Sequence, residues 1–210
     1  MLFMGIDLSS NPKKPSVFAI IDENVVLARI GTFNYFEELV SIIEKDKPNQ
    51  IAIDAPLGLP LGLDCLEEEH PCALTLDQKG RTAELELARM KIGCFFTTKR
   101  SIIKPLIYRG LEFSKGLNAL GHNVIEVYPY ATKVILFGSK IPPKNSIRGI
   151  SFLRERLSQL IHGIGTEMDE LDHDSCDALL SAYTSLLHAQ DKSRNLGMAE
   201  EGYIVIPKLT

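Results

Sequence analysis

The chain has 210 residues and a mass of 23.3 kDa, which is long enough for one domain to bury a hydrophobic core without disulfides or structural metal ions. A formal net charge of −4 argues against a protein that binds nucleic acid through bulk electrostatics, although it leaves local basic patches open. Four scattered cysteines do not form a disulfide framework, and no run approaches the ~18 apolar residues of a membrane span. The chain opens on a strand-like run instead of a basic leader, so we expect a soluble, cytoplasmic protein with reduced thiols and no membrane partner.

The first half of the chain alternates apolar runs with short groups of turn-forming residues. Two of the runs stop at an acid, Asp7 or Asp54, as buried strands of an open α/β sheet do where they meet a ligand crevice. A helical pattern over residues 35–45, with Asn34 as its N-cap, predicts a right-handed crossover that lays the second of these strands parallel to the first. As parallel neighbours, the two strands would bring both acids to one crevice. The strands expected in this half are residues 2–8, 16–21, 25–33 and 51–54.

The second half begins with a long irregular stretch. Residues 56–80 hold three prolines, an acidic run and no sustained periodicity, so we expect a functional loop over the crevice. Residues 91–109 form the one basic segment of an acidic protein, and we assign 56–121 as an insertion that carries it within a single domain, residues 1–210. The elements expected beyond the loop are helices at 81–91, 111–120, 131–137, 150–161 and 172–189 and strands at 123–128 and 203–206.

Acids stand where the predicted strands and the last helix meet the crevice. Two carboxylates about 4 Å apart repel by roughly 4 kcal/mol at an effective dielectric constant of about 20, so a group of them needs protons or a cation. Mg²⁺ and Mn²⁺ prefer such hard oxygen ligands, and two ions ~3.5 to 4 Å apart can activate a water and stabilise a leaving oxygen. The candidate catalytic acids are Asp7, Asp54, Glu126, Asp174 and Asp177, and all of these except Glu126 are candidate metal ligands.

Each acid also has a simpler explanation when it is taken alone. Asp7 and Asp54 are suited to start Asx-type turns after their strands, and Glu126 is suited to face solvent from a half-buried strand. Asp172 and Asp174 suit the N-cap and first turn of a helix, and we assign Asp172 to the cap. Asp177 lies beyond the capping turn, and a separation of three residues places it beside Asp174 on the helix surface. The joint occurrence of the acids therefore favours a site.

Five motifs span nearly the whole chain: Gly5-Ile6-Asp7, Ile51 to Gly58, Arg81 with Glu84 and Arg89, Glu126 to Pro129, and Asp172 to Leu179. Together they resemble the domain-of-unknown-function 429 family. That resemblance implies a predicted nuclease with a ribonuclease H-like α/β fold, in which helices flank a five-stranded mixed sheet of order 3-2-1-4-5. The acids at 7, 54, 174 and 177 also resemble those of RuvC-type Holliday-junction resolvases, although Asp54 stands where the resolvases have Glu.

The basic segment supplies candidate substrate-binding residues. Lys99, Arg100 and Lys104 are interleaved with aromatic residues that suit base stacking, and a solvated basic loop is the alternative. Arg81 and Arg89 lie just over two helical turns apart and suit phosphate capture, or they pair with acids of the same helix.

Cys65, His70 and Cys72 are zinc-capable residues within a short span. The sequence shows no evident fourth ligand, and the spacing is not that of a zinc finger. The role of these residues is therefore left open.

The acids and the basic segment predict a Mg²⁺- or Mn²⁺-dependent nuclease that hydrolyses phosphodiester bonds, with DNA or RNA as its partner and a homodimer left open. A nucleotide-dependent phosphotransferase of the sugar-kinase and actin class is disfavoured, because no glycine-rich phosphate loop follows the first strand. A non-catalytic module that binds nucleic acid or protein on the same fold is the other alternative, and the acidic net charge favours it.

Overall fold

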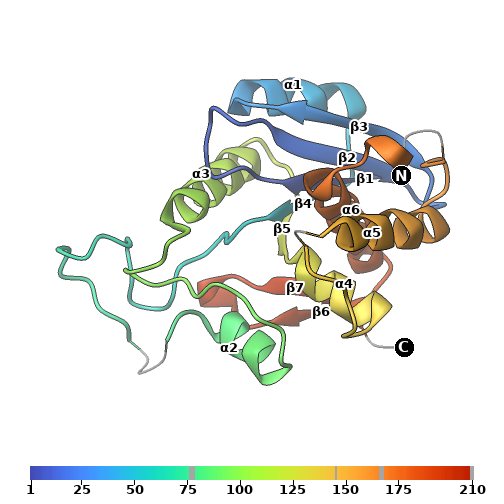
Figure 1. Cartoon of the computed structure of the whole chain (residues 1–210). Coiled ribbons are helices and arrows are strands. Elements are labelled where there is room, and N and C mark those ends of the chain that lie inside the picture. The colour runs from blue at the N-terminus through green and yellow to red at the C-terminus, as the bar shows by residue number, and fades with distance from the viewer. Residues whose placement is uncertain (76–78, 145, 166–167, 209–210) are drawn as a thin grey trace.

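The computed structural model describes residues 1–75, 79–144, 146–165 and 168–208, in which helices flank one mixed sheet (Figure 1). The strands are β1 (Leu2–Asp7), β2 (Ser16–Asp22), β3 (Leu27–Phe33), β4 (Gln50–Asp54), β5 (Val124–Val127), β6 (Ser193–Leu196) and β7 (Ile204–Pro207). The helices are α1 (Phe36–Asp46), α2 (Thr82–Arg89), α3 (Lys104–Ala119), α4 (Pro129–Phe137), α5 (Ile147–Leu160) and α6 (His173–Ala189), with 3₁₀ turns η1 (Met168–Glu170) and η2 (Ala199–Glu201). In the described ranges the strand order is β3-β2-β1-β4-β5-β7-β6, and β2 and β6 run antiparallel to the others.

The predicted α/β class and the order 3-2-1-4-5 are confirmed, but the sheet has seven strands in the described part of the chain, not five. The expected strand at 203–206 is β7, which lies inside the sheet because β6 pairs beyond it. The sequence analysis missed β6 because Ser-Arg-Asn-Leu is short and polar and carries no strand periodicity. No helix of the described ranges combines the length and apolarity that crossing a membrane requires.

Two helix starts also differ from the expected ones. The N-cap of α1 is Tyr35, not Asn34, and its side chain makes no capping hydrogen bond. Helix α3 begins at Lys104 instead of residue 111, because a proline in its first turn suits a helix start. Gly110, which obscured the pattern, lets this helix pass the loop after β4: a Cβ there would lie 2.6 Å from the Pro56 carbonyl oxygen.

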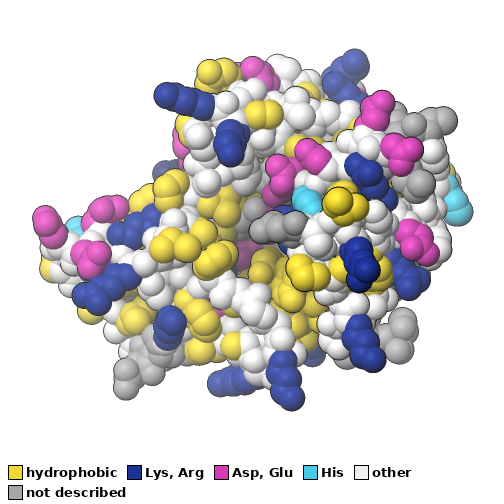
Figure 2. Space-filling view, in the orientation of Figure 1, with side chains coloured by type: hydrophobic (Ala, Val, Ile, Leu, Met, Phe, Trp, Pro, Cys, Tyr) yellow, Lys and Arg dark blue, Asp and Glu magenta, His cyan; other side chains and the backbone are white. Residues whose placement is uncertain are grey.

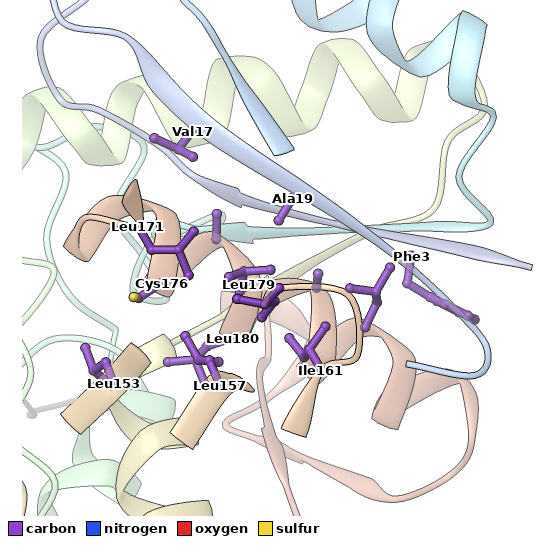
Figure 3. Packing of buried hydrophobic residues seen from close by; sticks show 14 of the residues in the cluster. Phe3, Val17, Ala19, Leu153, Leu157, Ile161, Leu171, Cys176, Leu179 and Leu180 are labelled. Atoms are coloured by element: carbon purple, nitrogen blue, oxygen red, sulfur yellow. The ribbon is translucent and has the colours of Figure 1, made fainter. Parts of the chain in front are cut away.

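The two faces of the sheet carry different helices. Side chains alternate along a strand, so Ile6 of β1 and Ile53 of β4 pack toward α1 and α3. Phe3, on the opposite face of β1, packs with apolar residues of β2, α5 and α6 (Figure 3). Any odd-numbered residue of β1, Asp7 included, therefore faces α6.

Helix α6 lies directly on β1 at Gly5. A Cβ at Gly5 would lie 2.0 Å from the Ala182 backbone nitrogen and 2.3 Å from the Ala178 carbonyl oxygen, distances at which backbone must move. Both helix residues are alanines with fully buried side chains. The missing side chain at Gly5 therefore sets how closely the first turns of α6 approach the carboxyl end of β1.

Replacing Gly5 with alanine should push α6 away from β1. We expect Gly5→Ala to lower the free energy of unfolding by about 3 kcal/mol, the upper range for overpacking a core, because rigid backbone is the obstacle. Gly93→Ala is the matched control, since a Cβ there meets no described atom within 4 Å. Urea unfolding of both variants checks this, and equal stability of the two would contradict the close contact.

Candidate functional site

The register of the sheet places two of the predicted acids side by side. Asp7 is the partner of Asp54 in the parallel β1–β4 pairing, so both end their strands at the same edge of the sheet. Both side chains leave the sheet on the face that α6 covers, because their neighbours Ile6 and Ile53 occupy the other face. Ligand crevices of open α/β sheets lie at this carboxyl edge.

Helix α6 brings two further acids to the same edge. Asp172 caps the helix, accepting a 2.8 Å hydrogen bond from the Ser175 N–H, as the sequence predicts. Asp174 is exposed in the first turn, and Asp177 is only 5% exposed one turn later. Both helix acids repel the carboxylate of Asp7, so acids of β1 and α6 share one crevice.

The crevice acids resist ionisation. Burial raises the pKa of Asp7 to about 8, and repulsion by Asp177 and Asp174 contributes to the shift. Burial also raises the pKa of Asp54 well above its usual range, with repulsion by Asp7 and then Asp177 as further causes. A cation at this edge would offset the mutual repulsion and stabilise the ionised form of both carboxyl groups.

Two lysines that the sequence analysis did not assign to the site supply part of the positive charge that the acids require. The Lys144 ammonium lies 2.7 Å from Asp177 Oδ2, and Lys133 Nζ lies 3.5 Å from Asp177 Oδ1. Burial lowers the pKa of Lys144, but attraction by Asp177, Asp7 and Asp174 outweighs this and raises it. Lys133 lies in α4 and Lys144 in the loop before α5, both far from Asp177 in sequence, so no local pattern marks them.

One oxygen of the crevice lacks a hydrogen bond. Asp177 Oδ1 is buried and accepts no hydrogen bond from any described residue, although it forms an ion pair with the Lys133 ammonium at 3.5 Å. Buried carboxylate oxygens are normally satisfied, so this atom indicates a missing partner such as water or a cation. His173 Nδ1, which lines the same cavity, is also buried without a partner among the described residues.

Two adjoining hollows with Lys144 at their border hold the acids. Asp54, Asp177 and His173 line a cavity of about 220 Å³, and Asp7 and Asp174 line the neighbouring groove. Figure 2 shows acidic side chains and a histidine gathered around the hollow at the centre of this face. No three of these acids have ligand atoms within 4.8 Å of one another, as the ligands of one compact ion site would. In the described ranges, the group that meets this spacing is Cys65, His70 and Cys72.

Glu126 lies beside one of these acids, since it lines a hollow with Asp54 and its charge contributes to the raised pKa of Asp54. Glu126 pairs with Ile53 in the β4–β5 register, so its side chain leaves the sheet on the face opposite to Asp54. There its oxygens accept hydrogen bonds from Arg81 at 2.7 and 2.5 Å and from the Leu57 N–H at 2.7 Å. Glu126 is therefore bound to Arg81 and the loop after β4 instead of offering its oxygens to the crevice that Asp7 and Asp177 share with Asp54, and its place in the catalytic set stays a prediction.

Arg81 likewise has a different position from the predicted one. Its side chain is 1% exposed and also donates to Glu84 Oε1 at 3.1 Å, which corrects its expected role in capturing phosphate. Desolvation lowers the pKa of Arg81, but Glu126 and Glu84 outweigh it and raise that pKa. The alternative that Arg81 pairs with Glu84 is the one observed. Arg81 thus ties the start of α2 to β5 and to the loop after β4.

The other predicted substrate-binding residues are spread over the segment beside the crevice. Arg89 is exposed at the end of α2, Lys99 donates to the His70 carbonyl oxygen, and Arg100 pairs with Glu68 at 3.2 Å. Lys104 begins α3, and its neighbours Ile102, Ile103 and Pro105 line the same groove as Asp7 and Asp174. Lys104 itself is not among the residues that line this groove, whereas Lys14 is.

Comparison with known proteins gives distant similarity to solved structures. No protein-family model and no curated protein match the chain. Among solved structures, the RuvC structure from Thermus thermophilus aligns with 10% sequence identity and a TM-score of 0.47, covering 97% of this chain and 100% of that chain. The resemblance to the domain-of-unknown-function 429 family therefore stays a prediction, and the site is argued from the geometry above.

Removing Arg81 should destabilise the protein. We expect Arg81→Met to lower the free energy of unfolding by about 3 to 5 kcal/mol, because Glu126 and Glu84 would remain buried without their cation. Arg89→Met, at an exposed position of the same helix, should change stability by less than about 0.5 kcal/mol. Urea unfolding checks this. An Arg81→Met protein of normal stability but weaker nucleic-acid binding would restore the phosphate-binding role.

Asp7 should make stability depend on pH. The folded protein keeps the Asp7 proton up to about pH 8, while the unfolded chain releases it near pH ~4, so its contribution is lost as pH rises between these values. As the pH rises from about 5 to about 8 without divalent ions, the free energy of unfolding of the wild type should fall by on the order of 1 to 2 kcal/mol more than that of Asp7→Asn. Glu44→Gln, on the exposed side of α1, is the control. Parallel pH profiles for wild type and Asp7→Asn would contradict the raised pKa.

Proposed function

We propose that this protein is a divalent-metal-dependent nuclease in which Asp7, Asp54, Asp174 and Asp177 hold Mg²⁺ or Mn²⁺. The observation that carries the proposal is the gathering of acids from β1, β4 and α6 at one carboxyl edge of the sheet, where burial and mutual repulsion raise the pKa of Asp7 and Asp54. Protein acids are seldom crowded in this way unless a cation or a proton is part of the function.

The ligand atoms that the chain offers fit Mg²⁺ or Mn²⁺. All four candidate ligands are hard carboxylate oxygens, and Asp177 Oδ1 has no described hydrogen-bond partner. When bound, such ions would activate water and stabilise negative charge on phosphate oxygens.

The chain's own residues would position the substrate around these ions. Lys144 is 52% exposed and touches the acids from the solvent side, so its ammonium is placed to exchange Asp177 for a phosphate oxygen. Lys104 begins α3 between Ile103 and Pro105, which line the groove of Asp7 and Asp174, and would bring a second ammonium near the substrate. Glu126 and Arg81 would act as positioning residues, because they hold the loop after β4 in place through the Leu57 N–H.

One observation favours a second candidate, a non-catalytic binding module. Lys133 and Lys144 already compensate the charge of Asp177 without any ion. If these contacts are permanent, the crevice needs no Mg²⁺ and would act as a mixed-charge binding surface. The two candidates differ in whether the protein's stability and activity respond to divalent ions.

Cleavage assays with matched variants decide between them. We expect the purified protein to cut at least one of a panel of labelled DNA and RNA duplexes, junctions and single strands with Mg²⁺ or Mn²⁺, and to lose this activity in EDTA. Asp54→Asn and Asp177→Asn should reduce the rate by a factor of about 100 or more, as losing a catalytic group does. Glu44→Gln should leave it unchanged.

Two results would contradict the nuclease. Cleavage that persists in EDTA or in Asp54→Asn would show that the crevice acids do not carry it. Binding of nucleic acid without any cleavage, together with a melting temperature that Mg²⁺ does not shift, would favour the binding module.

A further inference from the structure

The loop after β4 holds a second group of metal-ligating side chains. Cys65, His70 and Cys72 each place one ligand atom within 4.8 Å of the other two. The loop projects from the body of the molecule, as the teal segment of Figure 1 shows. None of the three residues lines the hollows that hold the crevice acids. This group is therefore separate from the proposed catalytic site.

The ligands differ in chemistry from those of the crevice. Two thiols and an imidazole are soft or borderline donors that select Zn²⁺ and similar ions, whereas Mg²⁺ prefers oxygen. Zn–S bonds of about 2.3 Å in a tetrahedral site place ligand atoms roughly 3.5 to 4 Å apart. The three ligand atoms, all within 4.8 Å of one another, lie close to this spacing.

The segment that carries the ligands is fastened to the rest of the protein. The Leu66 N–H donates to the Tyr108 hydroxyl at 2.8 Å, and Lys99 donates to the His70 carbonyl oxygen. Leu66 is fully buried and packs with Ile107 of α3, and Cys72 packs against the same cluster. The three ligands are therefore held near one another by contacts that do not involve a metal.

We propose that Cys65, His70 and Cys72 bind one thiophilic divalent ion, with Zn²⁺ as the natural occupant and solvent in the remaining position. The exposure of His70 leaves that position open to water. The ion would close residues 65–72 into one loop and hold the Cys72 side of a groove that Lys99 and Arg100 also line. Its role is structural support of this surface, whichever function the crevice performs.

Titration of the reduced, full-length protein with Co²⁺ tests the proposal. We expect one Co²⁺ per chain to bind with thiolate-to-metal charge-transfer absorption and to be displaced by Zn²⁺. Cys65→Ser and Cys72→Ser should each weaken this binding by about tenfold or more. Cys94→Ser, which removes a half-buried thiol outside the group, and Asp54→Asn should both keep it.

A second readout follows the loop itself. Zn²⁺ should slow proteolysis between residues 60 and 75 in the wild type and in Cys94→Ser, but not in Cys72→Ser. Three results would overturn the proposal: no charge-transfer absorption, absorption that survives in Cys72→Ser, or a Cys65–Cys72 disulfide that persists in reducing buffer and excludes the metal. Loss of Co²⁺ binding in Asp54→Asn with retention in Cys72→Ser would assign the ion to the crevice.

Discussion

The crowding of carboxylates at the carboxyl ends of β1 and β4 is the constraint on which the proposed chemistry depends. It exists because Asp7 and Asp54 are register partners and because α6 lies against β1 with no side chain between them at Gly5. A wider β1–α6 distance would let water screen Asp177 from the two strand acids and weaken their mutual repulsion. Close packing in the core is thus the physical cause of the unusual electrostatics at the edge.

The structure compensates buried negative charge in two ways on the two faces of the sheet. On one face, Arg81 donates hydrogen bonds of 2.5 to 3.1 Å to Glu126 and Glu84 and supplies their countercharge. On the other, lysines approach a single acid, Asp177, and one of its oxygens stays unsatisfied. The first arrangement is complete and suits a structural role, while the second is incomplete and suits a site that exchanges ligands.

Lys144 connects the competing interpretations of the crevice. Its ammonium attracts Asp177, Asp7 and Asp174 together, so it occupies the kind of position that a divalent ion would take. A half-exposed lysine can leave such a position at little cost, whereas the buried Lys133 cannot. The mobility of one side chain therefore decides whether the acids are a metal site or a permanent mixed-charge surface.

The sequence by itself determined the α/β class, the order of the first five strands and the meeting of Asp7 with Asp54, because continuous apolar runs and helical periodicity are local signals. It also indicated Asp172 as a helix cap, since capping depends on residues a few positions away. Only the tertiary structure decided the face of Glu126, the burial of Arg81 and the approach of Lys133 and Lys144 to Asp177. These depend on strand register and on contacts between distant segments, which no local pattern encodes, because a shift of one residue reverses the face of every side chain.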